Sequence, residues 1–199
     1  MDIIRKQTVK RSDPEKHPGG TPLAKAPRRD LGTEIIPKER YTSVEFMQLE
    51  WDKIWTKTWL LGCREDQIPE PGDFICTNIG AESVILVRQK NDEIKAFHNV
   101  CMHRGNRLAD EGLWHAESFV CGYHGWEYDS DGTFVDIPDL DTFQQGKPPC
   151  SGLAELPCET WVSFVWFSLN TEVEPLEEYI GDLIGHFEPY HFERMAMTR

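Results

Sequence analysis

Two short segments that each pair a cysteine with a histidine constrain this chain more than any other feature. The first reads Cys101-x-His103 and the second reads Cys121-x-x-His124. Seventeen residues lie between His103 and Cys121, so two separate loops offer one thiolate and one imidazole each. Four such ligands can hold a cluster of two irons and two sulfides, in which both thiolates bind one iron and both imidazoles bind the other.

A structural zinc ion is the alternative, because zinc also takes two cysteines and two histidines. Zinc fingers usually place their cysteines together and their histidines together, whereas each segment here mixes the two. Gly105, Gly122 and Gly125 also allow tight turns in which backbone N–H groups point at cluster sulfur. The pattern therefore favours the iron–sulfur cluster and predicts the two cysteines and two histidines as its ligands.

Hydrophobic spacing predicts a mainly β fold. From Trp59 onward, short runs of Val, Ile, Phe and Trp alternate with turn residues, as in an antiparallel β-domain. The predicted strands are residues 59–63, 73–79, 83–89, 94–98, 118–121, 126–128, 133–137 and 161–169.

Helices are expected on both sides of these strands. Thr42 and Glu45 have the spacing of a capping box, and an apolar stripe follows, which predicts a helix over residues 43–57. The stripe is expected to pack against the sheet. A C-terminal helical segment is predicted over residues 176–187, where apolar residues recur on one face.

Composition divides the chain into three parts. Residues 1–40 carry ten Lys or Arg against six Asp or Glu, with many Pro and Gly, which predicts a mobile basic arm. Residues 41–170 are expected to form the cluster domain with its leading helix. Residues 171–199 are expected to begin a further domain.

Charge and hydropathy exclude some classes of partner. A net charge of −13 disfavours nucleic acid. No apolar run approaches the roughly 20 residues that cross a bilayer, and the first ten residues lack the pattern of a secretory signal. The chain is therefore expected to be cytoplasmic and independent of membranes.

Four cysteines stand outside the two segments. Cys63 and Cys76 lie in apolar stretches, so they are expected to be buried free thiols. Cys150 and Cys158 flank a Pro-containing turn and would pair only in an oxidising compartment.

The sequence resembles the Rieske domain in the α (large) subunits of Rieske non-haem iron aromatic-ring-hydroxylating oxygenases. The likeness covers roughly residues 40–185, which is most of the chain. It includes both ligand segments, the residues Asn99 and Val100 before the first, and Tyr128, Gly132 and Pro138 after the second. The resemblance implies a Rieske [2Fe-2S] cluster held by Cys101, His103, Cys121 and His124.

The resemblance also implies a function. In such enzymes electrons from NAD(P)H pass through a reductase, with or without a ferredoxin, to the cluster, which feeds a non-haem Fe(II) that activates O₂. The α subunits form homotrimers or α3β3 assemblies. Residues 171–199 would then be the truncated start of the catalytic domain, and the Fe(II) is expected in the full-length enzyme and not in this chain. The alternative is an autonomous Rieske-type ferredoxin without catalysis.

His186 and His191 have the separation that the family's iron-binding histidines commonly show. Pro189 lies between them and would disturb a helix carrying both. They also lack a preceding Asn-Trp-Lys stretch, which the family's iron site has. We therefore predict that they are surface histidines and that this chain contains no catalytic residue.

Residues around the ligand segments are expected to influence the reduction potential of the cluster. Respiratory-chain Rieske proteins carry a disulfide between the loops and a serine hydroxyl after the second His-Gly. The matching positions here are Asn106, Tyr123 and Trp126, while Tyr128 retains a second hydroxyl position. The resemblance therefore implies a low-potential cluster. Nearby arginines, Arg104 and Arg107, are expected either to supply positive charge to the cluster or to pair with acidic surface residues.

Overall fold

The computed structural model describes residues 32–144, 146 and 149–196. The first 31 residues of the predicted arm lie outside the described residues. The rest is mainly antiparallel β structure with short helical segments before and after it, which confirms the predicted fold class. In this described part of the chain, no helix is both long and apolar enough to cross a membrane.

The helical segments are short and stand at the two ends and in the connections. They are α1 (Glu39–Thr42), α2 (Val44–Glu50), the π-helix η3 (Trp51–Trp55), the 3₁₀ turns η4 (Glu65–Gln67), η5 (Leu140–Thr142), η6 (Glu188–Tyr190) and η7 (Phe192–Arg194), and the helices α3 (Leu176–Ile180) and α4 (Leu183–Phe187).

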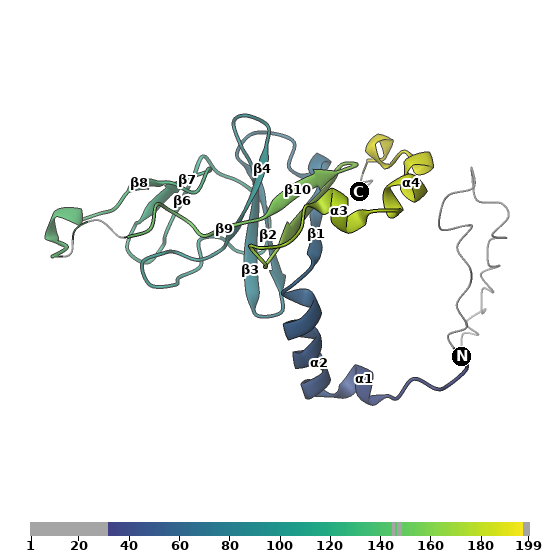
Figure 1. Cartoon of the computed structure of the whole chain (residues 1–199). Helices are drawn as coiled ribbons and strands as arrows, with labels where there is room; N and C mark the ends of the chain where they lie inside the picture. Colours follow the sequence, from purple (N-terminus) through teal and green to yellow (C-terminus); the bar gives the residue numbers. More distant parts are fainter. Residues whose placement is uncertain (1–31, 145, 147–148, 197–199) are drawn as a thin grey trace, which may run out of the picture.

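The strands form three antiparallel sheets, which Figure 1 shows side by side. The order is β1-β11-β10 in the first, β5-β2-β3-β4-β9 in the central one and β6-β7-β8 in the third. Their bounds are β1 (Trp59–Arg64), β2 (Asp73–Ile79), β3 (Glu82–Arg88), β4 (Ile94–His98), β5 (Gly112–His115), β6 (Ser118–Val120), β7 (Glu127–Asp129), β8 (Phe134–Asp136), β9 (Glu155–Leu156), β10 (Cys158–Trp161) and β11 (Phe164–Ser168).

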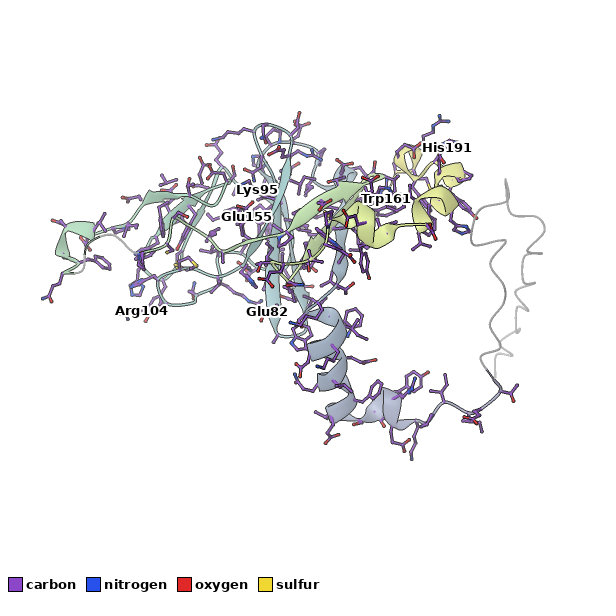
Figure 2. The ribbon with its side chains drawn as sticks, viewed as in Figure 1. Glu82, Lys95, Arg104, Glu155, Trp161 and His191 are labelled. Carbon is purple, nitrogen blue, oxygen red and sulfur yellow. The ribbon has the colours of Figure 1, made fainter. Side chains whose placement is uncertain are left out.

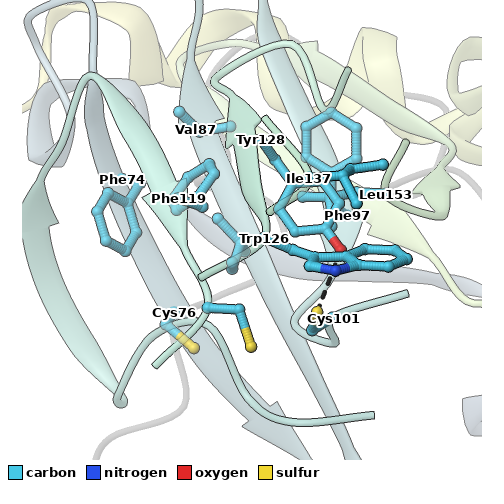
Figure 3. Packing of buried hydrophobic residues seen from close by; sticks show 12 residues of the cluster. Phe74, Cys76, Val87, Phe97, Cys101, Phe119, Trp126, Tyr128, Ile137 and Leu153 are labelled. Carbon is cyan, nitrogen blue, oxygen red and sulfur yellow. Dashed lines mark hydrogen bonds between the residues drawn. The ribbon is translucent and has the colours of Figure 1, made fainter. Parts of the chain in front are cut away.

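The central sheet is buried on both faces, and β3 shows this directly. Ile85 and Val87 belong to an apolar cluster shared with the third sheet, which Figure 3 shows from close by. Val84 and Leu86 belong to a second cluster shared with the first sheet. Because side chains alternate along a strand, only a nearly continuous apolar run can fill both clusters. This layering supports the third sheet, which carries the second ligand segment.

The strand predicted over residues 161–169 forms as β11, but it begins later than predicted, because a hairpin turn interrupts the start of the range. Strands β10 and β11 are joined by Val162 and Ser163, whose φ angles are 46° and 66°. Two consecutive residues with positive φ are the mark of a tight hairpin turn, which Asn and Gly normally signal. Neither residue gives that signal, and strands β5, β9 and β10 were not predicted either.

The leading helix begins differently from the prediction. Thr42 ends α1, and its hydroxyl donates to the carbonyl of Lys38 at 3.3 Å. Ser43 has extended backbone angles instead, and its Oγ accepts from the N–H of Phe46 at 3.1 Å, so Ser43 is the cap. The predicted packing of the apolar stripe is also largely wrong, since Met47 and Trp55 are exposed. Helix α2 extends away from the sheets in Figure 1.

The C-terminal helical segment is divided in two. Gly181 has a φ angle of 50°, which ends α3 before α4 begins. Helix α3 buries Leu176 and Ile180 against Trp59 of β1. The indole nitrogen of Trp59 donates to the carbonyl of Glu174 at 2.8 Å. The segment after the strands is therefore packed onto the β-domain.

Candidate metal centre

The two ligand segments form loops with the same backbone turn. In each, the cysteine N–H donates to the carbonyl five residues on, at 2.8 Å. The N–H of a glycine four residues on then donates to the cysteine carbonyl at 2.9 Å. Those glycines, Gly105 and Gly125, have φ angles of 72° and 73°, which a side chain would strain. Gly122 has no positive φ, so its predicted role in the turn is not supported.

The turns bring the two predicted cysteines together in the interior. Cys101 and Cys121 are 2% and 3% exposed and belong to the same buried cluster, and each thiol affects the pKa of the other. Burial raises the pKa of the Cys101 thiol above its ordinary value. Burial acts the same way on Cys121, but the N–H groups of Tyr123 and His124, together with the side chains of Cys101 and Asn106, outweigh it and lower the pKa of that thiol. The second loop thus favours a thiolate at Cys121.

Tyr128 connects the cysteine pair to the core. Its ring is fully buried, and its hydroxyl oxygen accepts from the N–H of Met102 at 3.0 Å. The same oxygen lies 3.2 Å from the sulfur of Cys101, a contact drawn as a dashed line in Figure 3. Burial, followed by the contact with Cys101, raises the pKa of Tyr128 above its ordinary value. The hydroxyl therefore stays protonated and can donate to a thiolate at Cys101.

The predicted histidines form the second pair. The ring centroids of His103 and His124 are 4.5 Å apart. His103 also stacks on Trp126, with centroids 4.6 Å apart and planes 7° apart. Sequence reasoning missed this stacking role, although an aromatic residue two positions after His124 was its signal. Burial, followed by electrostatic interaction with His124 and Arg104, lowers the pKa of His103, which favours the neutral imidazole.

One ring nitrogen in this pair has an unusual environment. Nδ1 of His103 is buried and has no hydrogen-bond partner among the described residues. A buried polar atom without a partner is costly, and a site that binds a metal is one explanation for it. A neutral imidazole keeps a lone pair on one nitrogen, which is the form that ligates iron. The orphaned atom therefore fits a metal ligand.

The donors converge as two pairs and not as one group. In the described part of the chain, no three His, Cys, Asp or Glu side chains gather as they would around a single metal ion. A two-iron cluster instead needs two protein ligands on each iron. The thiol pair and the imidazole pair lie on adjoining loops, so the residues present fit a [2Fe-2S] cluster.

Two further loop residues have contacts that bear on the site. The amide nitrogen of Asn106 lies 3.8 Å from the sulfur of Cys121 and so reaches from the first loop to the second. Arg104 is exposed, and its charge contributes to the lowered pKa of His103. Of the two roles left open for Arg104, the structure thus favours positive charge beside the ligand loop.

His186 and His191 lie away from both loops. Figure 2 shows His191 beside α4 at one end of the molecule and Arg104, next to His103, at the other. His191 has a φ angle of 51°, and its Nδ1 lies 3.2 Å from a carboxylate oxygen of Glu193. His186 contacts the rings of Phe187 and Tyr190.

Comparison with known proteins identifies the domain that carries these loops. The family described as the Rieske [2Fe-2S] domain matches residues 58–157. The large oxygenase component of the 2,4-dinitrotoluene dioxygenase system of Burkholderia sp. (strain RASC) is 36% identical over 152 residues, covering 75% of this chain and 34% of that protein. The large oxygenase component of the naphthalene 1,2-dioxygenase system of Pseudomonas putida is 35% identical over 148 residues, covering 73% and 33%. The chain thus spans about a third of the length of these curated relatives.

Solved structures of Rieske oxygenases also match this chain. Naphthalene 1,2-dioxygenase with indole in its active site superposes with a TM-score of 0.69 at 34% identity, covering 75% of this chain and 34% of that one. The apo form of a quaternary ammonium Rieske monooxygenase superposes with a TM-score of 0.72 at 25% identity, covering 78% and 45%.

Proposed function

Because this chain belongs to the Rieske [2Fe-2S] domain family, we propose that Cys101 and Cys121 hold one iron of the cluster and His103 and His124 hold the other. The observation that carries the proposal is the convergence of a buried thiol pair and an imidazole pair, one of whose nitrogens is buried without a partner. When bound, such a cluster accepts and passes on single electrons at a potential set by its ligands.

We infer that this electron transfer serves the α subunit of a ring-hydroxylating oxygenase, whose non-haem iron activates O₂. Two relatives are named as large components of dioxygenase systems, which supports the inference. The packing of α3 on Trp59 also supports it over an autonomous ferredoxin, which would not need that segment. Residues 41–170 would form the Rieske domain, and residues 171–199 would lead into the catalytic domain.

The proposed enzyme draws its electrons from NAD(P)H through a reductase, with or without a ferredoxin. Its α subunits are proposed to assemble as a homotrimer or as α3β3, in the cytoplasm, where thiols remain reduced. The net charge of −13 suits an electron donor with a basic face.

The cluster itself can be tested by reconstitution. The 199-residue chain, incubated without oxygen with ferrous iron and sulfide, is expected to turn coloured and to bind two irons and two acid-labile sulfides per chain. Partial reduction should then give the electron paramagnetic resonance (EPR) signal of a mixed cysteine and histidine cluster. A colourless chain that binds one zinc ion and no sulfide would reject the proposal in favour of a structural zinc site.

Substitution of Tyr128 by phenylalanine is expected to lower the reduction potential of the cluster. The hydroxyl beside Cys101 stabilises negative charge on the sulfur, and this charge increases on reduction. The expected fall is on the order of 60 mV, which for a one-electron couple corresponds to about a tenfold change in the equilibrium constant. Protein-film voltammetry of the reconstituted chain measures it.

Tyr179→Phe is the matched control for this measurement. The Tyr179 hydroxyl contacts Thr58 near the helical end of the molecule, far from the two loops along the chain. The control should therefore leave the potential unchanged. Equal potentials in Tyr128→Phe and the unaltered chain would show that the hydroxyl does not act on the cluster.

A further inference from the structure

The two ligand loops are closed in different ways. The second loop leaves β6 and enters β7, and these strands pair directly, with Val120 opposite Glu127. The first loop leaves β4 and enters β5, which do not pair with each other. Strand β4 lies between β3 and β9, while β5 pairs with β2. The first loop therefore has no strand ladder at its base, although it carries two of the four proposed ligands.

The side chain of Asn99 stands where that ladder is missing. Asn99 is 3% exposed and directly follows β4. Its Oδ1 accepts from the N–H groups of Leu108 and Ala109 at 3.0 and 3.1 Å, and its Nδ2 donates to the carbonyl of Ala109 at 2.7 Å. These three hydrogen bonds join the start of the loop to its end, as a pair of ladder bonds would.

The same amide also fixes the base of the loop to the central sheet. Nδ2 lies 3.1 Å from Oγ of Ser83 on β3 and 3.0 Å from Sγ of Cys76 on β2. The backbone N–H of Asn99 donates to the carbonyl of Ser83 at 2.8 Å. Both partners belong to strands whose register is set by six successive residue pairs. The closure is therefore anchored in two paired strands of the central sheet.

We propose that Asn99 is a positioning residue that closes the first loop, and thereby sets where Cys101 and His103 stand relative to the second loop. Its side-chain hydrogen bonds go to Cys76, Ser83, Leu108 and Ala109 and to no proposed ligand, so it acts through the backbone between residues 100 and 107. The closure stands on the hydrogen bonds alone, whereas its consequence for the cluster rests on the proposed function.

The closure is tested first without iron, by hydrogen exchange. In the unaltered chain, the amides of Leu108 and Ala109 should exchange as slowly as the hydrogen-bonded amide of Cys121, although they belong to no strand. In Asn99→Ala both should exchange at least about tenfold faster, while the Cys121 amide keeps its rate. Rapid exchange at Leu108 and Ala109 in the unaltered chain would overturn the proposal even if the variant does not fold.

Gln89→Ala is the matched control. Gln89 is also a buried amide, 5% exposed, and its Nε2 donates to the carbonyls of Val87 and Ser130, outside both loops. It should lower the melting temperature, as any lost buried hydrogen bond does, without changing exchange at Leu108 and Ala109. If the amides of Leu108 and Ala109 exchange equally faster in both variants, Asn99 contributes only to overall stability and does not close the first loop.

The second part of the test uses the chain reconstituted with iron and sulfide. Loss of visible absorbance in excess chelator should be about tenfold faster in Asn99→Ala than in the unaltered chain, and the EPR line positions should shift. Gln89→Ala should match the unaltered chain in both measurements, and identical spectra and loss rates in all three proteins would contradict the proposal. If the unaltered chain takes up no cluster, the proposed function fails, while hydrogen exchange still decides the role of Asn99.

Discussion

Substitution of His124 by alanine is expected to abolish the Rieske EPR signal. His124 supplies one of the two imidazoles in the proposed site, and its ring lies 4.5 Å from that of His103. Without it, the iron assigned to the histidines keeps one protein ligand of two, which is too few to hold a reducible cluster. Iron and acid-labile sulfide per chain should fall with the signal, and both can be measured on the same reconstituted sample.

His186→Ala is the control for this loss. His186 is a histidine on α4 that touches Phe187 and Tyr190 and lies outside both loops. Its substitution should leave the EPR signal and the iron content unchanged. An unchanged signal in His124→Ala would remove His124 from the ligand set, and a loss of iron in His186→Ala would show that the two C-terminal histidines were wrongly read as surface residues.

The two loops that carry the proposed ligands were predictable because their sequence signal is local. Each loop needs a cysteine and a histidine two or three residues apart with a glycine nearby, and all of these lie within six residues. The positive φ angles of Gly105 and Gly125 follow from the same short turns. A tight turn constrains only consecutive residues, so its sequence pattern can be recognised without knowing which distant residues it contacts.

Features that depend on contacts between distant residues were not predictable. The bonds of Asn99 reach Cys76, 23 residues away in sequence, and nothing near Asn99 signals them. Strand β9, at the edge of the central sheet, pairs through only two residues, too few to show alternation. The hairpin turn at Val162 and Ser163 forms because β10 and β11 pair on both sides of it, so tertiary pairing overrides the residues' own turn preferences.

Substitution of Gly152 by alanine is expected to have the largest effect on stability. A Cβ at this position would lie 2.0 Å from the carbonyl oxygen of Gly132 and 3.0 Å from Cα of Thr133. These are backbone atoms of the turn between β7 and β8, so no side chain can rotate away to make room. Overpacking of this kind costs about 3 kcal/mol or more. The melting temperature should fall by roughly 6–12 °C for a domain of this size, measured by circular dichroism.

The contact at Gly152 also links this prediction to the metal centre. Leu153, the next residue, donates its N–H to the carbonyl of Gly132 at 2.8 Å and belongs to the apolar cluster that contains both cysteines. Displacing the segment should therefore loosen the third sheet beneath the second loop, and the cluster of a reconstituted Gly152→Ala chain should be lost at a lower temperature. The neighbouring Ser151→Ala adds no Cβ at an exposed site and should shift the melting temperature by about 2 °C or less. If Gly152→Ala melts within that same margin, the backbone around Gly132 shifts to accommodate the added Cβ, and the close contact does not fix the position of the third sheet.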